Sequence, residues 1–445
     1  MRILLINTNR NRYLSPAPVG ALLVAEQLSR DGHDVHFLDL MHDKKPRAAL
    51  VAALENHRPD LICLSIRNVD NQMMAKLDRP LDEIAEFAAL LKTSGKPLLI
   101  GGTAVTTFPA QIRAKLGADY AFAGDDVEIF SRFVSSLERG EPDFDAPGLI
   151  AEKSGQLVQN PYSIRGYRDL RFGGYQRVNL KTYERKGYYA CGVVTHSGCP
   201  NGCSFCDAHR TFGRDYILRD PRMVLDELTE LRRKHGARSI WLINSGINRP
   251  LAYGKELLAK IVEAKLGLSL GCIIEPGEFD GEMARLMKRA GCGGAMIFGT
   301  TLDDRVLERN QPFYRRDDII EAAKLLRDVK LDFFLGQMFG APGETLAGIR
   351  ESMETAYRLK PAMMITGYGF RIGPDTPLRE MALNEGVIAD DDDLFTPHFY
   401  LPAGLTAGQI ASCLKSFRRS HPWQAVRFVS FIGREIWKAA FARSA

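Results

Sequence analysis

The stretch Ser197-Gly-Cys-Pro-Asn-Gly-Cys-Ser-Phe-Cys206 places three cysteines, Cys199, Cys203 and Cys206, within eight positions. It directly follows the apolar run Tyr189–Thr195, which has the length and composition of a buried strand. Parallel α/β folds bind their ligands at the carboxyl ends of their strands. A short loop with a proline and glycines can turn three thiolates towards one point. The stretch therefore predicts a metal centre in an α/β domain.

Three thiolates suit an iron–sulfur cluster with one open iron. A closed 4Fe-4S centre normally uses four cysteines, so three leave one iron free for a chelating substrate. The alternative is structural zinc with His196 or His209 as a fourth ligand, although such sites usually join two ligand pairs across a longer loop. Cys191 lies inside the apolar run, where a buried free cysteine is commoner than a ligand. The same interpretation applies to Cys63, Cys272, Cys292 and Cys413.

Strand and helix patterns alternate from this motif onwards. The expected strands are Tyr189–Thr195, Ser239–Ile243, Ser269–Ile274, Gly294–Phe298, Leu331–Gln337 and Met363–Phe370. Between the first two, the segment 220–236 begins with an Asp N-cap followed by Pro and ends with basic residues and Gly, which predicts a helix. Six such units favour a partial (β/α)6 barrel over residues 187–380, followed by a short helical region, 381–445.

The first 145 residues predict a separate α/β domain. Short apolar runs alternate with helical patterns there, as in a doubly wound parallel sheet. Its five expected strands are Ile3–Ile6, Asp34–Leu38, Leu61–Ile66, Pro97–Ile100 and Tyr120–Ala123. Residues 146–186 lose this regularity and are expected to form a linker.

The end of the first strand argues against a dinucleotide site, because Asn7–Arg12 stands where G-x-G-x-x-G would be needed. Ser65 and Arg67 close the third strand of this domain, and Gly101 and Gly102 close the fourth. Two glycines would let a bulky flat ligand approach the backbone closely. These four residues are therefore candidates for binding such a ligand.

The bulk composition is that of an ordinary soluble protein, with 45% hydrophobic and 25% charged residues. A net charge of +5 from 59 basic and 54 acidic residues is too dilute to indicate a nucleic-acid partner. The apolar run Met1–Ile6 is too short for a signal peptide, and no apolar stretch reaches the ~18–20 residues of a membrane span. A cytoplasmic protein is expected.

The cysteine motif resembles that of the radical S-adenosylmethionine superfamily, C-x3-C-x2-C with an aromatic residue before the last cysteine. Cys199, Cys203, Phe205 and Cys206 match it. The resemblance implies that the open iron binds the amino and carboxylate groups of S-adenosylmethionine. It also implies reductive cleavage to methionine and a 5′-deoxyadenosyl radical, with an electron donor such as flavodoxin or ferredoxin.

The same resemblance implies further cofactor contacts. Asn244 and Ser245 end the second barrel strand, where the family binds the methionine moiety, and Gly246 stands where a carboxylate is common. Gly340 and Glu344 belong to a turn that resembles the glycine-rich segment near the adenine. The alternative for this turn is a simple strand-to-helix connection. The sixth-strand segment, 368–378, also resembles these enzymes, and its Arg371 meets either substrate or a core carboxylate.

The N-terminal pattern resembles the cobalamin-binding domain of class B members of this superfamily. Matching segments are Pro16–Gly20, Gly32–Val35, the strand end at Ser65 and the Gly101-Gly102 turn. Many such domains have D-x-H-x-x-G after the first strand, whose His ligates cobalt, and this chain has no His in that loop. The resemblance therefore implies cobalamin without a protein histidine on cobalt.

Two further residues of this domain, Arg67 and His42, lie close to the expected strand ends. Arg67 is a candidate to lie near the lower face of cobalamin, and the alternative is an ion pair with Asp70. His42 follows the second strand and is expected at the surface.

The leading hypothesis is methyl transfer from methylcobalamin to an unactivated carbon of a small-molecule or lipid-like substrate. One alternative is a radical enzyme for dehydration, epimerisation or ring rearrangement with a cobalamin-free or repurposed N-terminal domain. A second is a non-catalytic cobalamin or iron–sulfur sensor. The aromatic and basic segment Ser416–Trp437 is expected to dock on the barrel as a helix, in preference to lying on a membrane.

Overall fold

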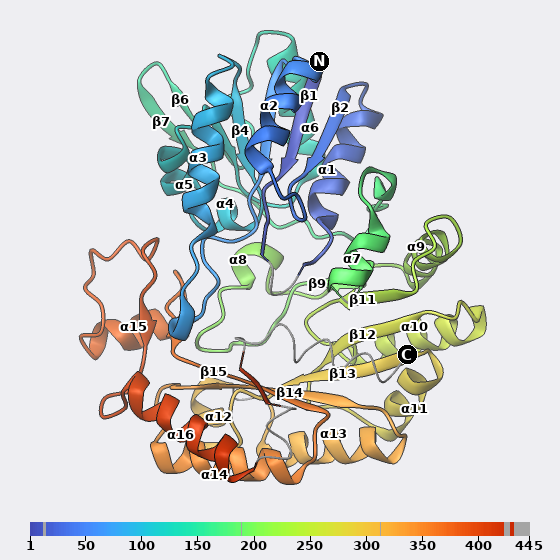
Figure 1. Cartoon of the computed structure of the whole chain (residues 1–445), viewed down its shortest axis with the longest axis vertical. Coiled ribbons are helices and arrows are strands. Elements are labelled where there is room, and N and C mark those ends of the chain that lie inside the picture. Colours follow the sequence, from blue (N-terminus) through green and yellow to red (C-terminus); the bar gives the residue numbers. More distant parts are fainter. Residues whose placement is uncertain (12–14, 188, 312, 422–427, 431–445) are drawn as a thin grey trace.

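The computed structural model describes residues 1–11, 15–187, 189–311, 313–421 and 428–430, and it stacks two α/β units (Figure 1). The first unit has a sheet with strand order β2-β1-β3-β4-β5-β6-β7, of which the first five strands are parallel. These strands are β1 (Arg2–Asn7), β2 (Asp34–Asp39), β3 (Leu61–Ser65), β4 (Leu98–Gly101), β5 (Tyr120–Phe122), β6 (Leu149–Lys153) and β7 (Gln156–Gln159).

Helices cover both faces of this sheet because its strands are apolar on both sides. In β1, Leu4 and Ile6 pack under one helix layer, and Ile3 and Leu5 pack under the other. The first layer contains α2 (Pro46–His57), α3 (Pro80–Lys92), α4 (Thr103–Thr107) and α5 (Pro109–Leu116), and the second contains α1 (Val19–Arg30) and α6 (Val127–Glu138). The predicted doubly wound domain is confirmed.

The sheet continues beyond the five predicted strands. The hairpin β6–β7 pairs antiparallel with β5 and lies inside the range 146–186, which was expected to be a linker. Gly148 makes the entry to this hairpin possible: its φ is +83°, and a Cβ would stand 2.3 Å from the Ala123 carbonyl oxygen. Such a short hairpin, half of it exposed, leaves little periodicity in the sequence.

Buried polar contacts join the remaining linker to the second unit. Arg219 is buried, forms an ion pair with Glu227 (2.8 Å) and donates to the Leu170 carbonyl (3.0 Å). The linker also contains η2 (Tyr175–Arg177) and α7 (Leu180–Gly187). Tyr183 of α7 donates to Asp39 of the first unit (2.7 Å), and its ring lies 4.9 Å from that of His42. His42 is therefore half-buried at the junction and does not lie at the open surface as expected.

The second unit is an open barrel with strand order β18-β15-β14-β13-β12-β11-β8 and parallel pairing throughout. Its strands are β8 (Cys191–Val194), β11 (Ser239–Ile243), β12 (Ser269–Ile274), β13 (Cys292–Phe298), β14 (Phe333–Phe339), β15 (Met363–Tyr368) and β18 (Phe428–Ser430). The predicted partial barrel is confirmed, and β18 adds a strand that was not expected.

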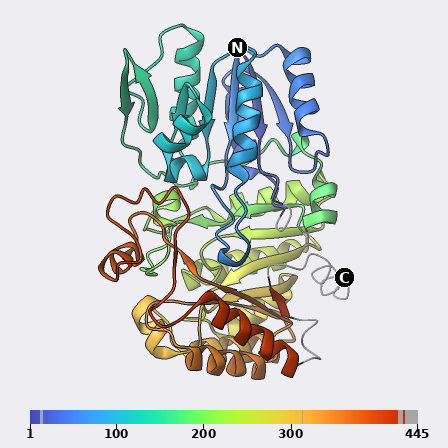
Figure 2. The ribbon, with the colours of Figure 1, turned by 60° about the vertical axis from the view of Figure 1, so that its left-hand side comes forward.

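Helices line the outside of this curved sheet (Figures 1 and 2). They are α9 (Pro221–Arg233), α10 (Leu251–Ala264), α11 (Gly281–Arg289), α12 (Asp304–Asn310), α13 (Arg316–Asp328) and α14 (Leu346–Arg358). Two short ribbons lie at the carboxyl edge, β9 (His196–Ser197) with β10 (Ile217–Leu218) and β16 (Phe370–Arg371) with β17 (Phe399–Tyr400). This edge faces the first unit, so the carboxyl ends of both sheets meet at one junction (Figure 1).

The C-terminal region contains α15 (Pro377–Asn384) and α16 (Ala407–Ser420). Helix α16 packs beside α14 with Leu414 and Phe417 in the barrel core, which confirms the expected helical region. Most of the segment Ser416–Trp437 lies outside the described residues. No helix in the described part of the chain is both long and apolar enough to cross a membrane.

Candidate active site

The cysteine loop is held in place by its own backbone and by an aromatic contact. Gly198 has φ +82°, and a Cβ there would stand 1.8 Å from the Asp215 carbonyl oxygen, so only glycine fits. The Cys199 N–H donates to the Gly213 carbonyl (3.2 Å). At the far end, the Phe205 ring lies 4.6 Å from that of Phe370 in β16. Phe205 therefore anchors the loop to the barrel edge.

Each of the three thiols has a hydrogen-bond donor from the chain. The backbone N–H of Asn201 donates to Cys199, and the backbone N–H of Ala208 donates to Cys206. The side-chain amide of Gln311 donates to Cys203 (Nε2 to Sγ 3.8 Å).

Burial raises the pKa of all three thiols, that of Cys203 to about 12, and the charge of Cys199 raises the pKa of both Cys203 and Cys206 further. Neighbouring thiolates in a buried site need a positive centre between them. Together with the donors, which favour the charged sulfurs, this arrangement fits an iron–sulfur cluster.

The geometry does not favour the zinc alternative. Among the described residues, no three His, Cys, Asp or Glu side chains are close enough to share one metal ion, whereas a cube binds each cysteine at a different iron. His196 is buried, its ring nitrogens lie 3.2 Å from Ser245 Oγ and 3.4 Å from Thr195 Oγ1, and burial lowers its pKa to about 4. His209 hydrogen-bonds the backbone at Cys206. The other five cysteines are buried, as expected.

Sequence reasoning missed one carboxylate, Glu275, which directly follows β12. Its charge raises the pKa of Cys199 and Cys203, so it faces the cysteine loop. Asn201 of that loop donates to Oε2 (2.6 Å), and Arg249 Nε lies 3.4 Å from Oε1. Burial raises the pKa of Glu275 itself. Among the described acidic residues, Glu275 is the one whose side chain hydrogen-bonds the cysteine loop.

Glu275 also explains Gly246, which ends the neighbouring strand. A Cβ on Gly246 would stand 3.3 Å from the Glu275 Cβ, so the small residue after β11 makes room for the acid after β12. Glu275 thus brings a carboxylate close to position 246, where the family commonly has one. The signal in the sequence was an acidic residue at a strand end, Ile274-Glu275.

Asn244 and Ser245 lie against the loop, at the end of β11. Ser245 Oγ donates to the Gly198 carbonyl (3.2 Å), and Asn244 Nδ2 donates to Thr195 Oγ1 (3.2 Å). Asn244 Oδ1 is buried and accepts no hydrogen bond from the described residues. The structure therefore brings Ser245 next to Cys199 and Asn244 next to Thr195, and the Asn244 oxygen remains available as an acceptor.

The turn after β14 is closed by Glu344. Its Oε2 accepts the N–H groups of Gly340 (2.5 Å) and Ala341 (3.3 Å), and burial raises its pKa to about 7. Thr345 then caps α14 by accepting the N–H of Gly348 (3.1 Å). Gly340 has φ +94°, and a Cβ there would stand 2.5 Å from Leu401 Cδ2. Both candidate residues thus have a role in shaping this turn.

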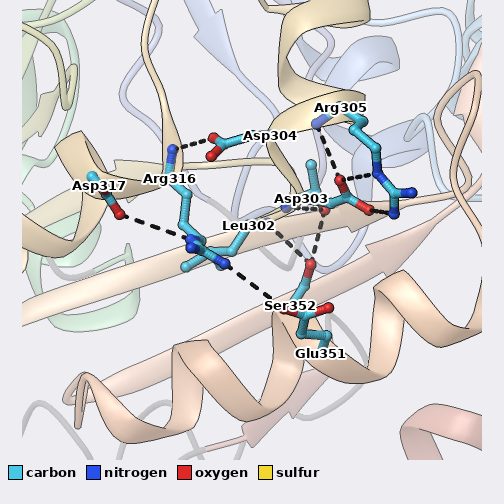
Figure 3. Close-up of polar contacts among 9 residues, drawn as sticks. Leu302, Asp303, Asp304, Arg305, Arg316, Asp317, Glu351 and Ser352 are labelled. Atoms are coloured by element: carbon cyan, nitrogen blue, oxygen red, sulfur yellow. Dashed lines mark hydrogen bonds and ion pairs between the residues drawn. The ribbon is translucent and has the colours of Figure 1, made fainter.

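A polar network fixes the connection from β13 to α12, and so positions Gln311. In Figure 3, the Ser352 hydroxyl accepts the Leu302 N–H (3.1 Å) and Arg305 pairs with Asp303 (2.8 Å). The Arg316 N–H donates to Asp304 (2.7 Å).

Gln311 immediately follows α12, where its Oε1 accepts the Thr300 hydroxyl. The opposite end of the amide must then present N–H, and this end faces Cys203.

The first unit presents Ser65, Arg67, Gly101 and Gly102 at its carboxyl edge. Gly102 has φ +108°, and a Cβ would stand 2.5 Å from the Ile66 carbonyl oxygen, so glycine is required by the fold itself. Arg67 is solvent-exposed, yet desolvation lowers its pKa. Arg67 is thus in contact with solvent but has protein on several sides, as expected for a residue that lines an internal space.

Asp70 and Arg371 join the two edges across the junction. Arg371 Nε donates to Asp70 Oδ2 (2.6 Å), with both side chains almost fully buried. The alternative that paired Asp70 with Arg67 is therefore wrong, and Arg371 meets a core carboxylate. The partners are 301 residues apart, which explains why local pattern could not identify them.

Comparisons with known proteins agree with this arrangement. The sequence profile of the Radical SAM superfamily matches residues 193–356, and that of the B12 binding domain matches residues 8–134. The tryptophan 2-C-methyltransferase of Streptomyces laurentii is 23% identical, over 82% of this chain and 72% of its own length. The anaerobic magnesium-protoporphyrin IX monomethyl ester cyclase of Cereibacter sphaeroides is 22% identical, over 92% and 69%.

Among solved structures, the radical S-adenosylmethionine methyltransferase TsrM of Kitasatospora setae, with cobalamin and a [4Fe-4S] cluster bound, superposes with a TM-score of 0.83. The match covers 96% of this chain and 90% of that one at 21% identity. At this identity the likeness establishes the fold, including the stacking of the two units.

Proposed function

Because the chain belongs to the cobalamin-binding radical S-adenosylmethionine enzymes, we propose that it transfers a methyl group to an unactivated carbon of a small molecule. Its cofactors are a 4Fe-4S cluster, S-adenosylmethionine and cobalamin. The observation that supports the proposal is the meeting of two carboxyl edges at one junction: the B12-binding sheet faces the edge that carries β9 and α8 (His209–Phe212), and the cysteine loop connects these two elements (Figure 1). The methyltransferases among its relatives favour this reaction.

When bound, the cofactors supply the radical and the methyl group. The role of the chain is to hold them in order and to keep water out. The three thiolates hold the cluster, and their N–H donors stabilise its negative charge. Asn244 and Glu275 offer acceptors for the ammonium group of S-adenosylmethionine. The buried Asp70–Arg371 pair joins the two units.

Arg67 is proposed to lie near the lower face of cobalamin, and Ser65, Gly101 and Gly102 to line its binding edge. The desolvated yet exposed guanidinium of Arg67 supports this placement. An external donor such as flavodoxin or ferredoxin is proposed to deliver the electron.

A labelling experiment tests the reaction. Anaerobically reconstituted protein is incubated with methyl-labelled S-adenosylmethionine, a reductant and extracts of candidate small molecules. Label in a new product together with 5′-deoxyadenosine is expected. Deoxyadenosine without a labelled product would instead support a rearrangement or ring-closing reaction, which the resemblance to a cyclase keeps as the second candidate.

A further inference from the structure

The inner face of the barrel differs from the helix-covered outer face in exposure. On β13, Ala295 and Ile297 are buried under the helices, whereas Met296 is half-buried and the Phe298 side chain is 47% exposed. The same alternation places Met338 of β14 and Gly367 of β15 on the inner face, both half-buried. Solvent therefore reaches the inside of the barrel at the carboxyl ends of β13, β14 and β15.

Two inward glycines keep this part of the barrel open. A Cβ on Gly336 would stand 2.7 Å from the Phe298 ring, and a Cβ on Gly367 would stand 2.7 Å from Met338 Sδ. Each glycine thus lets a large side chain of the neighbouring strand lie flat against the sheet instead of projecting into the interior. We call Met296, Phe298, Gly336, Met338 and Gly367 the apolar wall.

The polar groups of the barrel lie on the other side of the mouth. Cys199, Ser245 and Glu275 follow β9, β11 and β12, respectively, and continuation of the strand register places Phe298 next to Glu275. The boundary between polar and apolar surface therefore lies between β12 and β13. None of the described inward residues of β13, β14 and β15 is charged.

Beneath the apolar wall, the inner face is closed by a small separate core. Phe334, Met363 and Ile365 are buried there, with Met296 packed against them. The wall thus has an apolar floor as well as apolar sides, and its three strands carry no charged residue.

We propose that the apolar wall binds an uncharged aromatic ring of the substrate, which deepens, and rests on, the proposed function. Aromatic rings pack well against a ring such as Phe298, and methionine sulfur makes favourable contacts at ring edges, here from Met338 and Met296. Burying a charged group against this surface without a partner would be strongly unfavourable. The polar side, next to the cysteine loop, remains for S-adenosylmethionine.

Binding without turnover tests the proposal. Holoenzyme reconstituted with cluster and cobalamin is dialysed to equilibrium against 2-naphthol, a neutral aromatic probe. One saturable site is expected, with affinity at least tenfold lower in Phe298→Glu and unchanged within twofold in Leu157→Glu. Leu157 is a matched control because it is an exposed leucine (55%) on the distant hairpin strand β7.

Two results would overturn the proposal. The first is equal binding of 2-naphthol by the wild type and by Phe298→Glu. The second is displacement of the probe by dodecanol as readily as by indole, which would indicate that the wall binds an alkyl chain of the substrate. If Phe298→Glu does not fold, Gly336→Ala replaces it. A methyl group there must push the Phe298 ring off the wall, so a clear loss of probe affinity is expected and an unchanged affinity counts against the wall. Since no methyl transfer is measured, failure of the reaction and failure of the wall remain distinguishable.

Discussion

The two carboxyl edges that meet at the junction use opposite means to make a site. In the barrel, the site is made of side chains: three thiols, Glu275 and Gln311 converge from three separate segments. In the first unit, backbone dominates, because Gly102 lies directly against Ile66 and leaves an edge with little projecting from it. A small charged cluster requires ligands at defined positions, whereas a large flat cofactor requires space.

The largest effect is expected for Cys203→Ser, which should abolish the cluster in the barrel and leave the first unit intact. A serine hydroxyl is a poor ligand for iron, and two cysteines cannot retain the cube. We expect loss of iron, sulfide and S-adenosylmethionine cleavage, with cobalamin still retained. Cys413→Ser, in the buried part of α16, is the control and should keep its iron. Iron retained in the Cys203 variant would contradict the assignment.

Removing Arg371 should uncouple the two edges. Arg371→Met leaves Asp70 buried without its partner, which costs about 3–5 kcal/mol of stability. Denaturant unfolding of the full chain measures this loss. The double variant Asp70→Leu/Arg371→Met should recover most of it, because no buried charge is left. A double variant as unstable as the single one would show that the pair is not the cause.

Titration of Glu344 should give the barrel edge a pH-dependent stability. Its folded pKa of about 7 exceeds the usual 4.5, so the folded state favours the protonated form. The stability from this group is complete below pH 4.5 and is lost as the pH rises through 7, by about 3 kcal/mol in total. Glu344→Gln should flatten this decline in unfolding midpoints measured between pH 5 and 8. An unchanged pH profile would refute the assignment.

Adding a side chain at Gly102 should damage the first unit alone. Gly102→Ala forces a Cβ to within 2.5 Å of the Ile66 carbonyl at a positive φ, a strain of about 1–3 kcal/mol. We expect a lower unfolding midpoint and weaker cobalamin retention, with normal iron content. Gly20→Ala is the matched control: it lies in α1 with no atom within 4 Å of its added Cβ, and it should be neutral or stabilising.

The smallest effect is expected at Gln311, whose amide hydrogen-bonds Cys203. Gln311→Leu removes one N–H···S interaction worth about 1 kcal/mol, which corresponds to about 40 mV for a one-electron couple. The cluster potential should become more negative by this amount in an EPR-monitored redox titration. Gln311→Asn, which retains an amide, is the control for a general packing effect. An unchanged potential in the leucine variant would exclude a tuning role.

The sequence by itself determined the units of this protein. Short apolar runs alternating with helical patterns identified five strands of the first sheet and six of the barrel, and the spacing of Cys199, Cys203 and Cys206 predicted the cluster loop. These features depend on residues close together in the chain, so local pattern contains them. The hairpin β6–β7 and the edge strand β18 were not predicted, because each is short and is stabilised by the strand that it joins.

Only the tertiary structure decided which side chains meet. Glu275 lies 72 residues beyond Cys203, Gln311 lies 108 beyond it, and Arg371 reaches Asp70 across 301 residues. Periodicity states which face of an element is buried, but not which residue of another element it will contact. Such pairings follow from how the strands are ordered and how the two sheets stack, because only packing brings distant polar groups within hydrogen-bond distance.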